Sequence, residues 1–329
     1  MDRWCEVLKV PLCSNSSTYY RVAASLCLSP TSKTLAVPSA NAIFFNGDHV
    51  EGTGNPVIER LSDLKKIAEI LVSKFGHSIN AWVIEASVFN GPFAVYKDFI
   101  PSVNRWGEPK SYCPVGFPAS KSTVSLLSNC LEEVKKVISR RQVEQYPGSA
   151  SASQISEPKT LVLGFSKGGT VINQLVTELG FSAVRFTRNT LYTEEQRRGG
   201  QFLSLSEEVE IIPDTEESLL NSITEIHYVD VGLNSSGAYL TDHDVIRRIS
   251  ERLIQGSRGI RFVLHGTPRQ WCEKRRIWIR KEKDKLVRML ESEAQRCGGK
   301  LQVSERFYFA DSPPDIQMHF EIIENLDVS

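Results

Sequence analysis

The chain has 329 residues, and its 39 lysines and arginines balance 39 aspartates and glutamates, so the formal net charge at pH 7 is zero. This balance gives no global electrostatic reason to bind nucleic acid or an acidic membrane, and we expect no nucleic-acid partner. The content of 41% hydrophobic and 24% charged residues is typical of a folded protein and excludes a disordered chain.

The predicted elements of the first half begin with a short apolar strand that ends in a turn, Asn46-Gly47-Asp48. A long irregular segment, 87–118, is rich in proline, glycine and asparagine, and a low-complexity stretch, 146–154, is expected to be a solvated loop. The regular elements expected here are strands at 42–45 and 81–85 and helices at 58–75 and 122–143.

The second half repeats the alternation of buried strands and amphipathic helices. The segment 185–220 fits neither pattern and is expected to be an insertion. The strands expected are 160–165, 225–230, 260–265 and 301–309, with helices at 169–179, 244–254 and 278–293. Such alternation predicts an α/β fold with a mostly parallel central sheet and helices on both faces. We expect one domain over 1–329, with inserted loops at about 87–118 and 185–220.

Cysteine usage and the chain's apolar runs bear on its location. Seven scattered cysteines without a C-x-x-C pair predict no disulfide framework and no zinc site, and they favour a reducing compartment. No stretch approaches the ~18 apolar residues that cross a bilayer, so no transmembrane segment is expected. The first residues lack the features of a secretory signal or an Arg-rich presequence. We expect a cytoplasmic location, with the mitochondrion as the alternative.

Residues Gly164-Phe-Ser166-Lys-Gly168 match the pattern G-x-S-x-G between an apolar strand and a helix. In this context the pattern indicates a strained turn that exposes the Ser166 hydroxyl next to the free N–H groups of the helix. A Gly-rich turn without chemistry is the alternative. The pattern does not match a P-loop, because the required G-x-x-x-x-G-K-[ST] spacing is absent.

A serine nucleophile needs a base, which in this type of fold follows the serine and an acid in the chain. His319, in a loop opening the C-terminal helix, is the preferred base, and His265, at the end of a strand, is its rival. Asp230 ends the preceding strand and is the candidate acid; Asp242 and Asp244 are the alternatives, and a turn role for Asp230 stays open.

Two backbone donors are needed to hold an oxyanion. Lys167, after the serine, and Asp48, after an early strand, are the candidates, although the Asp48 loop could be only a tight turn. We expect the pocket to be formed by the loops 46–52, 87–118 and 185–220. Aromatic residues suited to an apolar acyl group, or simply to packing the loop, are Phe89, Phe93, Tyr96, Phe99 and Trp106.

These motifs resemble a eukaryotic family of α/β-hydrolase-like proteins without an assigned substrate, whose animal members are mitochondrial. The resemblance covers about residues 42–324. It is carried by Phe44-Phe-Asn-Gly-Asp48, the G-x-S-x-G pattern, Thr267-Pro268, Trp278-Ile279, Lys281-Glu282 and His319-Phe320. It implies an α/β-hydrolase-like scaffold in which Ser166 and His319 occupy matching positions, whereas Asp230 rests on its placement alone.

The sequence therefore predicts a serine hydrolase of esterase, lipase or thioesterase type that forms an acyl-enzyme on Ser166. The expected partner is a small-molecule acyl substrate, and neither a cofactor nor a metal is implied. A non-catalytic protein of the same fold, binding a lipid-like ligand or a protein partner, is the alternative. Acyl transfer to an acceptor other than water would use the same residues, and the sequence leaves the oligomeric state open.

Overall fold

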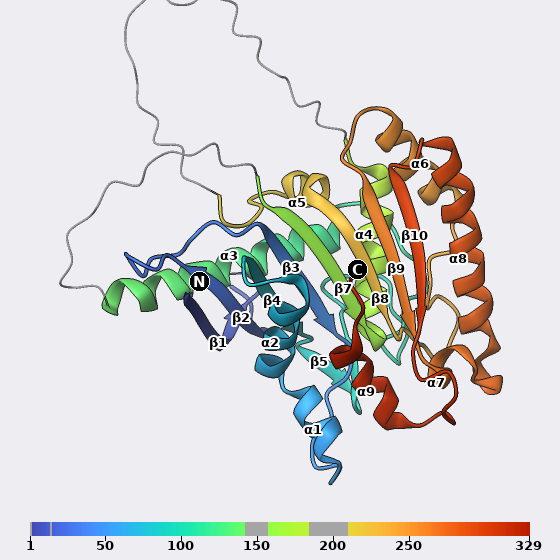
Figure 1. Ribbon diagram of the computed structural model, residues 1–329, viewed down its shortest axis with the longest axis horizontal. Coiled ribbons are helices and arrows are strands. Elements are labelled where there is room, and N and C mark those ends of the chain that lie inside the picture. The colour runs from blue at the N-terminus through green and yellow to red at the C-terminus, as the bar shows by residue number, and fades with distance from the viewer. Residues whose placement is uncertain (1, 14, 142–156, 184–209) are drawn as a thin grey trace, which may run out of the picture.

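The computed structural model describes residues 2–13, 15–141, 157–183 and 210–329. The predicted loop at 146–154 and most of the predicted insertion at 185–220 lie outside these ranges. The described residues form an eight-stranded sheet in the order β1-β2-β4-β3-β7-β8-β9-β10. Figure 1 shows this sheet with helices packed on it.

The strands of the large sheet run parallel, except that β2 is antiparallel to both of its neighbours. A separate hairpin, β5 (Val88–Asn90) and β6 (Phe93–Val95), interrupts the segment after β4. The bounds of the large sheet are β1 Asp2–Pro11, β2 Tyr19–Leu28, β3 Ala40–Asn46, β4 Ile79–Glu85, β7 Lys159–Phe165, β8 Ile223–Val229, β9 Ile260–Gly266 and β10 Leu301–Phe307.

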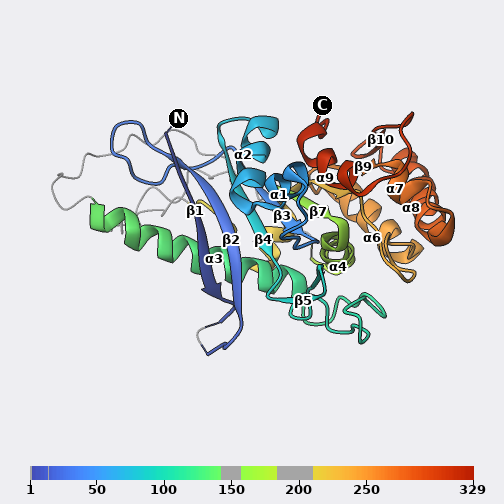
Figure 2. The same ribbon diagram turned by 90° about the horizontal axis from the view of Figure 1, so that it is seen from below.

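Each central strand buries both faces, because successive side chains point to opposite sides of the sheet. In β3, Ala42 and Phe44 pack in one core cluster, and Ile43 and Phe45 pack in the other. The first face is covered by α1 (Pro56–Ser62), α2 (Leu64–Phe75) and α9 (Ile316–Asn325). The opposite face is covered by α3 (Pro118–Arg141), α4 (Gly169–Phe181), α6 (His243–Ile254) and α8 (Ile277–Arg296). Figure 2 shows the two layers edge-on.

This topology is the α/β-hydrolase fold, so the predicted fold class is confirmed. A three-residue 3-10 turn, η1 (Ser166–Gly168), joins β7 directly to α4. Because the strands on either side of β7 are parallel to it, their carboxyl ends meet at one edge of the sheet. Residues that follow β3, β7, β8 and β9 are therefore brought together there.

Two predicted elements differ from the structure. The helix expected at 58–75 is two helices, because the chain is extended at Asp63, whose carboxylate accepts the Lys66 N–H and caps α2 (2.7 Å). His319 was expected in a loop, but it lies within the first turns of α9, which begins at Ile316. The antiparallel pair β1–β2 was not predicted at all.

Candidate active site

Ser166 occupies a sharp turn between β7 and α4. Its φ angle is +50°, a left-handed conformation that is unfavourable for a residue with a Cβ. The turn is held by close backbone packing, since a Cβ on Gly168 would overlap the carbonyl oxygen of Phe45. Such a turn directs the side chain toward the carboxyl edge of the sheet, where Ser166, itself buried, lines a cavity.

The loop after β3 lies against this turn. A Cβ on Gly47 would overlap both the Phe165 carbonyl oxygen and the Lys167 nitrogen, so only glycine permits the approach. The Asn46 side-chain amide donates to the Asp48 carbonyl oxygen (2.9 Å) and fixes the course of the loop. Asp48 and Lys167, the two predicted oxyanion donors, consequently line the same cavity as Ser166.

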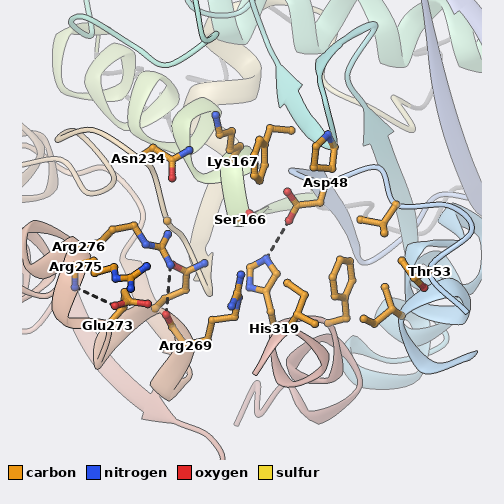
Figure 3. A pocket seen from close by; sticks show the side chains of 18 of the residues that line it. Asp48, Thr53, Ser166, Lys167, Asn234, Arg269, Glu273, Arg275, Arg276 and His319 are labelled. Atoms are coloured by element: carbon orange, nitrogen blue, oxygen red, sulfur yellow. Dashed lines mark hydrogen bonds and ion pairs between the residues drawn. The ribbon is translucent and has the colours of Figure 1, made fainter. Parts of the chain in front are cut away.

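His319 lies between two carboxylates. Its Nδ1 donates to Asp230 Oδ2 (2.6 Å), and its Nε2 donates to Asp48 Oδ2 (3.0 Å). All three side chains are almost fully buried. The imidazole also lies 4.6 Å, between ring centroids, from the ring of Phe165. Figure 3 shows the imidazole and the Asp48 carboxylate facing each other beside Ser166.

This arrangement determines the charge of His319. Burial, the largest influence, lowers the pKa of His319, but the hydrogen bonds and negative charges of Asp230 and Asp48 outweigh burial and raise the pKa to about 9. At neutral pH the imidazole is therefore protonated on both nitrogens. No hydrogen bond joins the Ser166 hydroxyl to His319 within the described residues, because Nε2 is engaged by Asp48.

Asp230 follows β8 directly and has a φ angle of +43°, a conformation that aspartate tolerates better than most residues. Its carboxylate is fully buried and accepts the Thr267 N–H (2.7 Å) and the Thr267 hydroxyl (3.0 Å) in addition to His319. Thr267 begins the segment after β9, so it holds Asp230 toward the imidazole. Its role was not predicted, although Thr267-Pro268 is one of the motifs that carry the family resemblance.

The alternative candidates lie elsewhere. His265 is buried between His227 Nδ1 (3.0 Å) and the Tyr308 hydroxyl (2.8 Å), and it does not line the cavity. Asp242 caps α6 by accepting the Asp244 N–H (2.9 Å), and Asp244 itself forms ion pairs with arginines on the same helix. None of these three side chains contacts Ser166 or His319 within the described part of the chain.

The cavity has a volume of about 920 Å³. Two of the three loops expected to form it contribute, 46–52 through Asp48 and Val50 and 87–118 through Pro92 and Phe93. The described part of 185–220 contributes no lining residue, and the segment 269–278 forms that wall instead. Of the five aromatic residues singled out in the sequence, Phe93 alone lines the cavity; Tyr96 and Phe99 pack in the core, and Trp106 is exposed.

A buried ion pair fixes one wall of the cavity and was not predicted. Lys167 Nζ lies 3.2 Å from Glu108 Oε1, and both side chains are nearly fully buried. The Glu108 carboxylate also accepts the Asn234 N–H (2.8 Å) and the Ser235 hydroxyl (2.6 Å). Glu108 thus connects the segment after β6, the turn at Ser166 and the segment after β8.

Two general features concern metals and membranes. The described residues contain no group of three or more histidine, cysteine, aspartate or glutamate side chains placed to hold a metal ion. Among the described helices, none has the length and apolar character needed to cross a bilayer.

Several solved structures are similar to this chain at low sequence identity. The S-formylglutathione hydrolase from Agrobacterium tumefaciens is 10% identical with a TM-score of 0.39, covering 98% of this chain and 92% of that one. The siderophore hydrolase EstA from Aspergillus nidulans is 13% identical with a TM-score of 0.43, covering 98% and 95%. The BES protein from Bacillus cereus is 13% identical with a TM-score of 0.44, covering 99% and 93%.

Sequence comparison identifies relatives of this chain. The C2orf69 family profile matches residues 200–295. The mitochondrial protein C2orf69 of Homo sapiens is 23% identical over 327 residues, covering 87% of this chain and 74% of the human protein. The Danio rerio homolog is 23% identical over 265 residues, covering 79% of this chain and 64% of that protein. The family resemblance predicted from the sequence is therefore confirmed: this chain is similar to the C2orf69 family, whose human and Danio rerio proteins are named mitochondrial.

Proposed function

We propose that this protein is a serine hydrolase of esterase, lipase or thioesterase type that forms an acyl-enzyme on Ser166. The observation that carries the proposal is the grouping in one cavity of Ser166, strained at a strand–helix turn, with a histidine whose Nδ1 is held by the buried carboxylate of Asp230. A nucleophile, a base and a group that orients the base are the parts that acyl transfer through a serine requires.

The proposed reaction has two stages. His319 Nε2 accepts the Ser166 proton while Oγ attacks the substrate carbonyl, and the backbone N–H groups of Lys167 and Asp48 hold the oxyanion. The imidazolium then gives its proton to the departing alcohol or thiol, and the C–O or C–S bond breaks. Water, deprotonated by His319, attacks the acyl-enzyme, and Ser166 recovers the proton as the carboxylic acid leaves.

The proposed reaction requires two changes from the arrangement described above. His319 Nε2 must exchange the Asp48 carboxylate for the Ser166 hydroxyl and lose a proton before it can act as a base. Asp48 Oδ1 has no hydrogen-bond partner within the described residues, whereas both Asp230 oxygens are engaged. We infer that Asp48 is the carboxylate that moves away when a substrate enters.

A second candidate function is favoured by that same contact. Because Asp48 occupies His319 Nε2, a protein in which this ion pair is permanent would bind an acyl-like ligand without cleaving it. The two functions differ in whether Ser166 reacts covalently.

Labelling with a fluorophosphonate probe tests the proposal. The full chain is expected to be labelled, because an activated serine attacks the phosphorus of the probe and becomes phosphonylated as fluoride leaves, and Ser166→Ala is expected to reduce labelling to background. Ser73→Ala is a matched control, since Ser73 is an exposed serine of α2 that does not line the cavity. Equal background labelling of the wild type and Ser166→Ala would refute the hydrolase proposal and favour the binding function.

We propose a mitochondrial location for this chain. The named human and Danio rerio proteins are mitochondrial, and we extend this location to the present chain in place of the cytoplasm.

A further inference from the structure

Three arginines gather on one wall of the cavity. Arg269 belongs to α7 (Pro268–Trp271), and Arg275 and Arg276 belong to the 3-10 turn η3 (Lys274–Arg276), so a single segment between β9 and α8 supplies all three. Figure 3 shows them on one side of His319, away from Asp48. We call Arg269, Arg275 and Arg276 the arginine wall.

Few carboxylates of the protein lie near enough to balance the positive charge of the arginine wall. None of its three guanidinium groups forms an ion pair with a carboxylate anywhere in the described ranges of the chain. The lining carboxylate nearest in sequence, Glu273, accepts the backbone N–H of Arg275 (2.9 Å), and among the described residues the Arg276 guanidinium donates a hydrogen bond only to the Arg269 carbonyl oxygen (3.4 Å). Three positive side chains therefore share one neighbouring carboxylate, Glu273, and Arg276 also lies within electrostatic reach of Asp230 and Glu108; Lys167, on another wall, is paired with Glu108.

A buried guanidinium without a counter-ion is costly, because the group keeps its charge and loses hydration. Arg276 is partly buried; burial, followed by the charge of Arg269, lowers its pKa. The planar guanidinium is the side chain best suited to bind a carboxylate or a phosphate through two parallel hydrogen bonds. An anion bound at the arginine wall would supply the charge that the protein itself does not.

The other side of the cavity has the opposite character. Val50, Ile58 and Phe320 line it and belong to the apolar cluster beneath α1, α2 and α9. Thr53, from the same loop as Val50, lies across His319 from the arginine wall in Figure 3. Ser166 therefore lies between an apolar surface and a positively charged surface.

We propose that the substrate is an anionic acyl ester or thioester, with an apolar group on one side of the scissile carbonyl and a phosphate or carboxylate on the other, held by the arginine wall. The proposal rests on the proposed function for the position of the carbonyl at Ser166. It goes further by assigning Arg275 and Arg276 to the recognition of the anion.

Binding to the Ser166→Ala protein tests this inference without any turnover. Two matched pairs of ligands are titrated calorimetrically: S-octanoyl-pantetheine and its phosphate ester, and S-octanoyl-mercaptopropionate and the corresponding amide. At least one anionic member is expected to bind about tenfold or more tightly than its neutral counterpart, since one charge-assisted hydrogen bond contributes about that factor. The pair that shows the preference identifies the anion as a phosphate or a carboxylate.

Substitution of the arginines completes the experiment. In the Ser166→Ala background, Arg276→Gln and Arg275→Gln are expected to abolish most of the preference for the anionic member. Lys274→Gln is the matched control, because this exposed lysine lies in the same 3-10 turn but does not line the cavity. Circular dichroism establishes that each variant is folded, and exposed Arg275 gives a variant that leaves the core untouched.

Two results would overturn the inference: equal affinity for the anionic and neutral members of both pairs, or a preference that survives both arginine substitutions. Failure of the proposed function is separate, because it appears as absent labelling of the wild-type serine. A protein that binds the anionic thioester but is never labelled would support the arginine wall and reject hydrolysis.

Discussion

The imidazole of His319 contacts two carboxylates, and one of them is held by more hydrogen bonds than the other. Asp230 accepts hydrogen bonds from the Thr267 backbone and hydroxyl as well as from His319. Asp48, in contrast, has one oxygen without a partner in the part of the chain that the structure describes. Asp230 therefore fixes the orientation of the ring, and Asp48 determines whether Nε2 is free.

Substitution of Asp48 is expected to activate the base. Asp48→Asn removes one of the two negative charges that raise the pKa of His319 to about 9, so the pKa falls and a larger fraction of the imidazole is neutral at pH 7. Fluorophosphonate labelling at pH 7 should then accelerate by about tenfold for each unit of the fall. The rising limb of the labelling rate against pH should move to lower pH.

Asp242→Asn provides the control for this substitution, because Asp242 caps α6 and lies outside the cavity. Its labelling rate should follow the wild-type pH dependence. An Asp48→Asn protein that is folded but reacts no faster than the wild type at pH 7 would show that Asp48 does not restrain the base.

At the scale of elements, the junction of β7 and α4 depends on backbone contacts that allow no side chain. Gly168→Ala would force a Cβ against the Phe45 carbonyl oxygen of β3. We expect the free energy of unfolding, measured by urea denaturation, to fall by about 3 kcal/mol, the upper part of the usual range for overpacking. Labelling at Ser166 should decrease at the same time, because the turn must shift.

Gly298→Ala is the comparison for this prediction. Gly298 has a φ angle of +63° but no neighbour near its Cβ position, so its substitution carries only the backbone penalty of about 1 kcal/mol. If Gly168→Ala lost no more stability than Gly298→Ala, the close approach of β3 to the turn would not be a constraint.

The elements predicted from sequence are those with an unambiguous pattern. β3, β7 and β9 are runs of apolar residues buried on both faces, which the sequence displays directly. β1 is an edge strand whose exposed positions are Asp2, Glu6, Val7 and Lys9, so it lacks a continuous apolar signal. The helix break at Asp63 was missed because the apolar periodicity of α1 continues almost in phase into α2.

The residues of the candidate site likewise include some that the sequence predicts and others that it does not. The sheet edge shared by Ser166 and Asp230 could be inferred because each directly follows a strand, and His319 was singled out because it comes near the start of the C-terminal helix, although it was expected in the loop before that helix. The arginine wall could not, since charged residues in short connections usually form a solvated surface. The ion pair of Lys167 with Glu108 was not predicted either, because the two residues come from segments far apart in the sequence and meet only in the folded protein.

At the scale of the whole molecule, three buried histidines make the stability of the fold depend on pH, and they do so in opposite directions. Burial lowers the pKa of His227 and of His265, which lie on neighbouring strands and contact each other (3.0 Å). The unfolded chain binds protons at these positions near pH 6.5 and the folded chain does not, so stability falls as pH drops below that value. His319 acts oppositely, because its raised pKa adds stability below pH 6.5 that is lost as pH rises through about 9.

These responses predict a maximum of thermal stability near pH 6.5, the ordinary pKa of histidine. The unfolding midpoint should be lower at pH 5.5 and at pH 8.5, about one to two units to either side. His265→Gln should flatten the acidic limb and leave the alkaline limb in place. A midpoint that rises steadily from pH 5.5 to 8.5 would show that His319 is not charged in the folded protein.

The order of the strands in the sheet differs from their order in the chain. β3 pairs with β7, although α1, α2, β4 and α3 lie between them, and β2 pairs with β4 rather than β3. Contacts between such distant segments slow folding, because long loops must close before any pairing stabilises them. Asp48, Ser166, Asp230 and His319 follow four such segments, so the reactive group does not exist in a partly folded chain. A newly synthesised chain therefore has no assembled nucleophile during the slow stage of folding, before its distant strands have paired.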